Sequence, residues 1–210
     1  MKETRFYLLI ILVVAMLACC NSKTATIQGK EVLFSGFLDD YSILRDGGKG
    51  EPLFFYKNPK VDLSAYQKIL LDPIAILPGP QSKLEKIPSG DLLLLTNRFY
   101  TYLETELSKN YEIVREPAPG AMRVQVAITN LERPRDLRFS RNASIEGKLT
   151  DSLTGYLLMA AVDSRMVHSS FKGSKDYWDD TDRIFKFWVD RFAYKLCKER
   201  SVANCIPPQK

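Results

Sequence analysis

An uninterrupted apolar segment near the N-terminus, residues 6–18, limits what the rest of the chain can fold into. It follows the short charged segment MKETR and carries no charged side chain. A membrane-spanning helix needs about 20 apolar residues, and this segment stays shorter even when Cys19 and Cys20 are added to it. We therefore interpret residues 1–18 as an export signal that is removed from the mature protein. The fold must then form outside the cytoplasm, from residue 19 onward.

Residues 16–19, MLAC, resemble a lipobox, the motif in which a cysteine thiol takes a diacylglycerol. A small residue, Ala18, precedes Cys19 as this motif requires, whereas choosing Cys20 would put Cys19 at the small-residue position. We therefore predict lipidation at Cys19, with Cys20 as the alternative acceptor. Because one acyl chain gives only reversible membrane binding and a lipoprotein cysteine carries several, this anchor would be effectively permanent. An ordinary signal followed by two free cysteines is the other alternative.

The residues after Cys19 indicate the membrane and the domain boundaries. In lipoproteins of this kind an aspartate directly after the cysteine favours the inner membrane, and here Cys20 follows. We therefore expect the periplasmic face of the outer membrane, with the inner membrane as the alternative. Residues 19–31 are mostly polar without periodicity, which predicts a lipidated flexible tether. Residues 32–206 are predicted to form one periplasmic domain, and residues 207–210 a tail.

Composition narrows the range of partners. The chain has 210 residues and a formal net charge of +5. A domain of this size can bury a real core without metals. An exported protein does not meet cytoplasmic nucleic acid, and its basic residues form no long tract, so we expect no nucleic-acid partner. An envelope protein, peptidoglycan or anionic lipid head groups are better candidates.

Hydrophobic patterning predicts the order of the elements. Residues 38–62 are rich in Gly, Pro, Asp and Tyr and predict an irregular arm with one or two short extended pieces. An apolar run over residues 68–77 predicts a strand that Pro73 bulges or confines to an edge. A helix is expected over residues 89–109, with apolar residues at intervals of three and four. Strands are expected at residues 111–115, 123–129, 144–151 and 156–165, the last two joined by a turn at Gly155.

A second helix is expected from Asp180 or Thr181, either of which could cap it, to about Leu196. The order β-α-β-β-β-β-α predicts an α+β fold, a mainly antiparallel sheet with two helices packed on one face and an irregular N-terminal arm before it. Near the end of this helix, Cys197 and Cys205 lie close in sequence. Disulfides persist in an oxidising compartment, so we predict that these two cysteines are paired.

Five segments together resemble domain-of-unknown-function family 3313, a family of Gram-negative lipoproteins. They are SGFLDDYSIL at residues 35–44, the run at residues 58–72, RVQVAIT at residues 123–129, DSLTGYLLMAAVD at residues 151–163 and WDDTDRIFKFWVDRF at residues 178–192. The resemblance extends from Ser35 to about Leu196. It implies an envelope lipoprotein and supplies no catalytic residues, because the family has no established activity.

Neither a hydrolase triad nor a calcium loop is expected. The single histidine, His168, lies in a polar segment, and the chain has no Gly-x-Ser-x-Gly elbow. A calcium loop starting at Asp176 would need glycine at its sixth position and glutamate at its twelfth, which are Thr181 and Phe187. Helix capping explains the aspartates around residue 180 better. We expect no catalytic residue, no metal and no cofactor.

Two segments are candidate partner surfaces. Asp39 and Asp40 stand beside Tyr41, where they could face a partner or make local hydrogen bonds in a turn. The segment RPRDLRFSRN carries four arginines that suit phosphate or carboxylate groups, although a solvated loop is also consistent with it. These arginines are Arg133, Arg135, Arg138 and Arg141. The sequence predicts a non-enzymatic binding or scaffold module; the alternative is an envelope hydrolase that uses paired carboxylates such as Asp39 and Asp40.

Overall fold

The computed structural model describes residues 24–27, 30–132, 141–167, 178–200 and 205–208. The chain divides into two compact units, Met1–Phe34 and Ser35–Lys210. In the first unit, strands β1 (Thr24–Ile27) and β2 (Lys30–Leu33) pair antiparallel. The segment predicted as a flexible tether therefore includes a short hairpin, as β-branched residues at alternate positions favour. The division of residues 1–31 into signal and tether stays a prediction.

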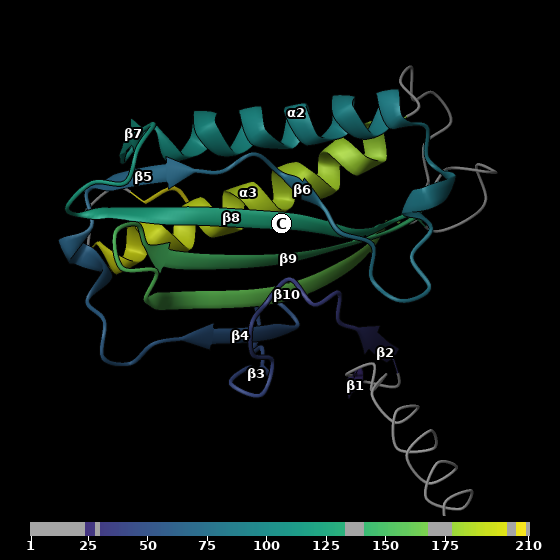
Figure 1. Ribbon diagram of the computed structural model, residues 1–210, viewed down its shortest axis with the longest axis horizontal. Coiled ribbons are helices and arrows are strands. Elements are labelled where there is room, and N and C mark those ends of the chain that lie inside the picture. Colours follow the sequence, from purple (N-terminus) through teal and green to yellow (C-terminus); the bar gives the residue numbers. More distant parts are fainter. Residues whose placement is uncertain (1–23, 28–29, 133–140, 168–177, 201–204, 209–210) are drawn as a thin grey trace, which may run out of the picture. The chain divides into compact units, whose positions relative to one another are not determined.

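An eight-stranded sheet forms the centre of the second unit (Figure 1). Its strands along the chain are β3 (Arg45–Asp46), β4 (Phe54–Lys57), β5 (Lys68–Leu71), β6 (Ala75–Ile76), β7 (Glu112–Val114), β8 (Ala121–Leu131), β9 (Arg141–Asp151) and β10 (Leu157–Val167). In space they follow the order β3-β4-β10-β9-β8-β5-β7, and β6 also pairs with β8. The predicted arm thus contributes two short strands, β3 and β4, to one edge.

The long strands β8, β9 and β10 pair antiparallel, as do β3 and β4 at the edge. Strand β5 runs parallel to both β7 and β8, and β6 runs parallel to β8. The predicted α+β class with a mainly antiparallel sheet is therefore confirmed. The parallel strands arise because helix α2 (Ser89–Leu107) connects this edge of the sheet to β7 as a crossover.

Pro73 explains why the single strand predicted over residues 68–77 is two strands in the structure. The run at residues 68–77 divides into β5 and β6, with Pro73 between them, and both parts pair with β8. The Asp72 N–H still donates to the Val124 carbonyl at 3.0 Å. Pro73 has no N–H to continue that ladder, so pairing resumes only at Ala75. The expected disturbance at Pro73 is confirmed.

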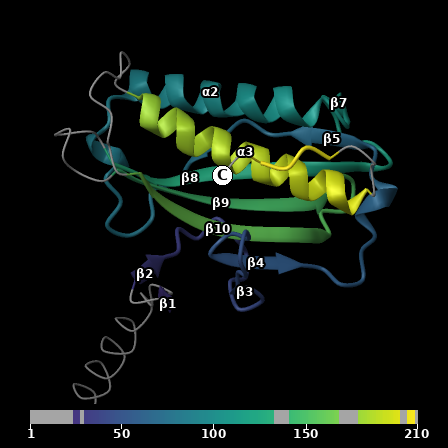
Figure 2. The ribbon, with the colours of Figure 1, turned by 180° about the vertical axis from the view of Figure 1, so that it is seen from behind.

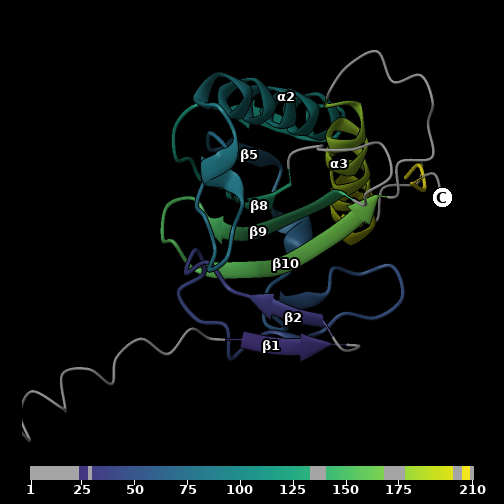
Figure 3. The ribbon, with the colours of Figure 1, turned by 90° about the vertical axis from the view of Figure 1, so that its right-hand side faces the viewer.

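Two helices cover one face of the sheet, α2 and α3 (Asp179–Glu199), as Figures 1 and 3 show. Two short 3-10 helices, η1 (Leu63–Ala65) and η2 (Leu84–Lys86), lie in the connections before α2. Seen from behind in Figure 2, α3 runs obliquely across the sheet beside α2. None of the described helices is long and apolar enough to cross a bilayer.

The helix ends differ slightly from those predicted. Helix α2 ends at Leu107 rather than at residue 109. Helix α3 begins at Asp179, with Trp178 at the N-cap position and no capping hydrogen bond from its side chain. Asp180 and Thr181 are buried inside the first turn and so do not cap the helix. The predicted cap is wrong by two to three residues, and the residue at the cap position is the buried Trp178.

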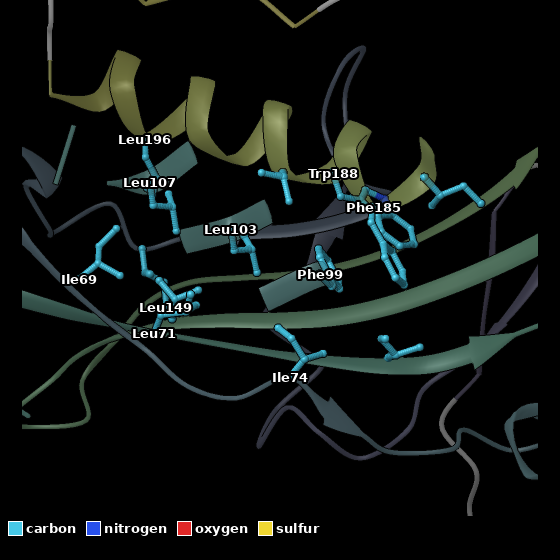
Figure 4. Packing of buried hydrophobic residues seen from close by; sticks show 14 of the residues in the cluster. Ile69, Leu71, Ile74, Phe99, Leu103, Leu107, Leu149, Phe185, Trp188 and Leu196 are labelled. Carbon is cyan, nitrogen blue, oxygen red and sulfur yellow. The ribbon is translucent and has the colours of Figure 1, made fainter. Parts of the chain in front are cut away.

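Aromatic side chains join the two helices above the sheet (Figure 4). Phe99 of α2 stacks on Phe185 of α3 with ring centroids 4.4 Å apart, and Trp188 lies 6.3 Å from each of them. The apolar face predicted for α2 lies in this core, and α3 contributes Ile184, Trp188 and Leu196 to it. Its labelled members include Leu103 and Leu107 from α2 and Leu196 from α3, above Leu71 and Leu149 of the sheet.

The hairpin between β9 and β10 and the disulfide follow the predictions. Gly155 has a φ of +72°, the left-handed conformation that a turn needs and that glycine adopts without strain. Asp151 holds the turn by accepting hydrogen bonds from the Leu153 and Thr154 N–H groups. Cys197 of α3 is bonded to Cys205, with their Cα atoms 5.7 Å apart.

Candidate functional site

The sheet face opposite the helices carries the polar residues of β8 and β9. Leu149 of β9 belongs to the core under the helices, so Glu146 and Lys148, an odd number of residues away, point to the other face. Arg123 and Gln125 of β8 are directly opposite Thr150 and Lys148 and share this face. We call residues 35–44, which pack against this face, the strap.

Glu146 fixes the first residue of the strap to the central strand of the sheet. It lies on β9, between Ala127 of β8 and Val162 of β10, and its relative exposure is 0%. One carboxylate oxygen accepts the Ser35 N–H at 2.7 Å. The other accepts a short hydrogen bond from the Tyr41 hydroxyl. A buried carboxylate is tolerated only with such donors, so this side chain specifies where the strap lies.

Tyr41 extends this network into the strap itself. Its hydroxyl oxygen accepts the Gly36 N–H at 2.9 Å and the Leu38 N–H at 3.2 Å. Burial, and then the hydrogen bond to Glu146, raise the pKa of the Tyr41 hydroxyl to about 12. The hydroxyl therefore stays protonated at neutral pH and keeps donating to Glu146.

Lys148 holds the strap at a second point, two residues farther along the same face of β9. Its ammonium lies 3.1 Å from a carboxylate oxygen of Asp39 and 5.4 Å from the centre of the Phe37 ring. The Asp39 side chain is 93% exposed, whereas that of Lys148 is only 17% exposed. The exposed partner makes this a weaker contact than the one at Glu146.

Asp72, Arg123 and Gln125 form a polar row beside the strap. The Arg123 Nε donates to both carboxylate oxygens of Asp72 at 2.9 Å, and its NH2 lies 2.8 Å from one of them. The Gln125 amide donates to the same carboxylate at 3.0 Å. The hydrogen bond to Asp72 raises the pKa of Arg123. The row is a preformed polar surface, with its charges already held in place.

The structure gives Asp39, Asp40 and Tyr41 different roles. The Asp40 carboxylate accepts the Ser42 N–H at 2.8 Å and the Ser42 hydroxyl at 2.7 Å, an ordinary turn. Tyr41 is buried and bonded inside the strap, so its hydroxyl does not face a partner. Asp39 and Asp40 are both exposed, and Asp39 pairs with Lys148. Asp40 and Tyr41 thus make local hydrogen bonds, and the use of the three residues as a partner surface stays a prediction.

Most of the other predicted site residues lie in segments that the structure does not describe. Arg133, Arg135 and Arg138 lie outside the described residues, as do His168, Asp176, Cys19 and Cys20. Arg141 contributes its backbone to β9, opposite Val167. Within the described part of the chain, no group of three or more His, Cys, Asp or Glu side chains could hold a metal ion. The expected absence of a metal or cofactor stays a prediction.

Sequence patterning did not identify Glu146 or Lys148 as site residues. Both occupy the polar positions of an alternating strand, a pattern that also describes an ordinary solvent-exposed face. Glu146 differs from an exposed residue because the strap covers it. The residues next to it in the sequence do not indicate this contact.

The family predicted from the sequence is found by direct comparison. The sequence model of DUF3313, described as a protein of unknown function, matches residues 34–136. Residues 34–136 of the chain are therefore similar to the DUF3313 family. The match begins beside Ser35, the predicted start of the resemblance, and ends before β9, so it does not extend to Leu196 as expected. The match covers the strap and the polar row, but not Glu146.

Several solved structures resemble this chain in fold. The PelC dodecamer from Paraburkholderia phytofirmans has 10% identity and a TM-score of 0.43, covering 71% of this chain and 96% of that one. Lipoprotein GNA1162 from Neisseria meningitidis has 13% identity and a TM-score of 0.38, covering 62% and 98%. A minor lipoprotein from Acinetobacter baumannii has 9% identity and a TM-score of 0.37, covering 64% and 95%. No curated protein matches the chain in sequence.

Proposed function

We propose that this protein is a lipid-anchored envelope protein, held on the periplasmic face of the outer membrane through Cys19. In this proposal the unit Ser35–Lys210 is a non-enzymatic binding or scaffold module. The observation that carries the proposal is the attachment of the strap: the first residues of the unit are bonded to the fully buried Glu146.

A strap fixed in this way suits a tethered domain. A lipid at Cys19 would transmit any pull from the membrane to the first residues of the folded unit. Those residues are bonded at two points of β9, Glu146 and Lys148, and not only at an edge strand that could peel away. Because Glu146 is buried in the middle of the sheet, detaching the strap would leave its carboxylate without the Tyr41 and Ser35 donors. This supports a function that requires the domain to stay on its tether.

The polar row supports binding. Arg123 and Gln125 are held by one carboxylate, that of Asp72, so a partner would meet a surface whose side chains are already ordered. An envelope protein, peptidoglycan or anionic head groups all offer the hydrogen-bonding groups that such a surface needs. Asp40, one of the two acids that a hydrolase would use, is engaged in its own turn. These contacts favour a binding module over the hydrolase.

Metabolic labelling with an acyl probe tests the anchor. The wild-type protein should label, Cys20→Ser should label equally, and Cys19→Ser should not. Labelling that persists in Cys19→Ser and disappears in Cys20→Ser would move the acceptor by one residue. A wild-type protein that takes no label would contradict the anchor. Separation of inner and outer membranes of the labelled cells then tests the membrane assignment.

In-cell crosslinking followed by mass spectrometry tests the module. A photo-crosslinking residue at position 125, in the polar row, should capture a defined envelope partner. The matched control places the same residue at position 115. The Arg115 side chain there is 77% exposed and contacts Tyr100 and Glu104 of α2. Identical products from the two positions would argue against a partner at the polar row.

A further inference from the structure

Three side chains where α3 meets β10 form a cluster that the strap and the polar row do not use. The guanidinium carbon of Arg165 lies 3.2 Å from the centre of the Phe187 ring, and that of Arg191 lies 4.2 Å from the same centre. The two guanidinium carbons are therefore separated by no more than the sum of these distances. All three side chains are partly exposed, so a ligand can reach them from solvent.

Most guanidinium N–H groups of Arg165 and Arg191 have no acceptor among the residues that the structure describes. Within the part of the chain that the structure describes, neither guanidinium forms an ion pair, and Arg165 makes no hydrogen bond. Arg191 donates from NH1 to the Gly50 carbonyl at 2.9 Å, but its Nε is buried without a hydrogen-bond partner. A buried donor without an acceptor is costly, and two like charges beside one ring repel. An anion at this place would offset both costs.

The carboxylate of Asp163, whose charge acts on Arg165, has its hydrogen bonds elsewhere. Asp163 lies two residues before Arg165 on β10, but its oxygens accept the Trp188 indole N–H at 2.6 Å and the Leu53 N–H at 3.1 Å. The carboxylate is thus used inside the fold, and burial raises its pKa. Burial lowers the pKa of Arg165; the charge of Asp163 opposes this effect, and the charge of Arg191 adds to it. The balance of charge at the cluster is positive.

We propose that Arg165, Phe187 and Arg191 form a binding site for a phosphate group. A phosphate monoester offers three acceptor oxygens and more than one negative charge, which matches two planar guanidinium groups better than a single carboxylate does. Phe187 holds both guanidinium planes in place by cation–π contact, so little ordering is needed on binding. The phosphate could belong to a soluble compound or to a lipid head group. The site would exist whether or not Cys19 carries lipid.

Titration calorimetry of the full-length protein in a phosphate-free, low-salt buffer with neutral detergent tests this site. Inorganic phosphate should bind the wild type, and Arg165→Gln and Arg191→Gln should each bind it about tenfold more weakly. Arg165→Lys keeps the charge but not the planar fork, so it should also bind more weakly than the wild type. The matched control, Arg115→Gln, removes an exposed arginine already paired with Glu104 and should bind like the wild type.

Two outcomes would overturn the site: a wild type that binds no phosphate, or equal binding by the wild type and both glutamine variants. Thermal unfolding of each variant shows that weaker binding is not loss of the fold. Arg165→Gln is the decisive variant because the Arg165 guanidinium makes no hydrogen bond to any residue that the structure describes. Glycerol phosphate and short-chain phosphatidic acid separate the two sources. Tighter binding of the lipid identifies a head group, and equal binding identifies the phosphate alone.

Discussion

Glu146 on β9 determines where the strap is attached to the sheet. A substitution of its hydrogen-bond partner Tyr41 tests this. Tyr41→Phe removes the hydroxyl that donates to Glu146 and accepts the Gly36 and Leu38 N–H groups. Because hydrogen bonds to a buried charge are the stronger ones, we expect the free energy of unfolding to fall by about 2 kcal/mol in urea denaturation. Tyr156→Phe, at a tyrosine 52% exposed, is the matched control and should change it by less than about 0.5 kcal/mol. Equal losses in the two variants would mean that the network contributes nothing.

A second residue, Glu51, makes the free energy of unfolding depend on pH in the acidic range. Hydrogen bonds from Arg45 and Gly48, and a further one from Lys195, lower the pKa of the Glu51 carboxyl from 4.5 to about 2. The unfolded chain therefore takes up this proton first, so the contribution is present above pH 4.5 and is lost as the pH falls toward 2. In thermal unfolding at pH 7, the midpoint temperature of the wild type should be higher than that of Glu51→Gln. This difference should shrink as the pH falls from 4.5 to 2. A gap that widens as the pH falls would contradict this assignment.

At the scale of elements, local pattern accounts for most of what the sequence predicted. The intervals of three and four along α2 and the turn at Gly155 are each set by neighbouring residues, and each was predicted. The contacts of Glu146 were not, because Ser35 and Tyr41 lie 111 and 105 positions away. Periodicity within a strand tells which residues share a face, but not whether a distant segment covers that face.

The contact between α2 and α3 is the element-scale interaction that we expect to matter most for stability. Phe99 is 1% exposed and stacks on Phe185, so Phe99→Ala should leave a cavity between the helices and the sheet. We expect a loss of about 4 kcal/mol in the free energy of unfolding. Leu93→Ala, on the same helix but 63% exposed, should cost less than about 1 kcal/mol. Comparable losses would show that the aromatic stack does not hold the helices together.

At the scale of the whole molecule, the boundary between the two units predicts how much of the chain the fold needs. A chain that begins at Ser35, preceded only by an initiator methionine, keeps the Ser35 N–H and all of the strap. Its free energy of unfolding should lie within about 1 kcal/mol of that of the full chain. A chain that begins at Arg45 lacks the strap and leaves the Glu146 carboxylate without two donors. We expect it to lose at least about 3 kcal/mol.

Glu146→Gln in both chains separates the strap's bonds to Glu146 from its other contacts. With the strap present, the substitution replaces a charged acceptor of two hydrogen bonds and should destabilise the protein. Without the strap, the same substitution removes an uncompensated charge and should be neutral or stabilising. A difference of more than about 1 kcal/mol between the two effects measures the coupling of the strap to Glu146. Equal effects would mean that the strap is held by the packing of residues such as Leu38, and that the carboxylate is incidental to it.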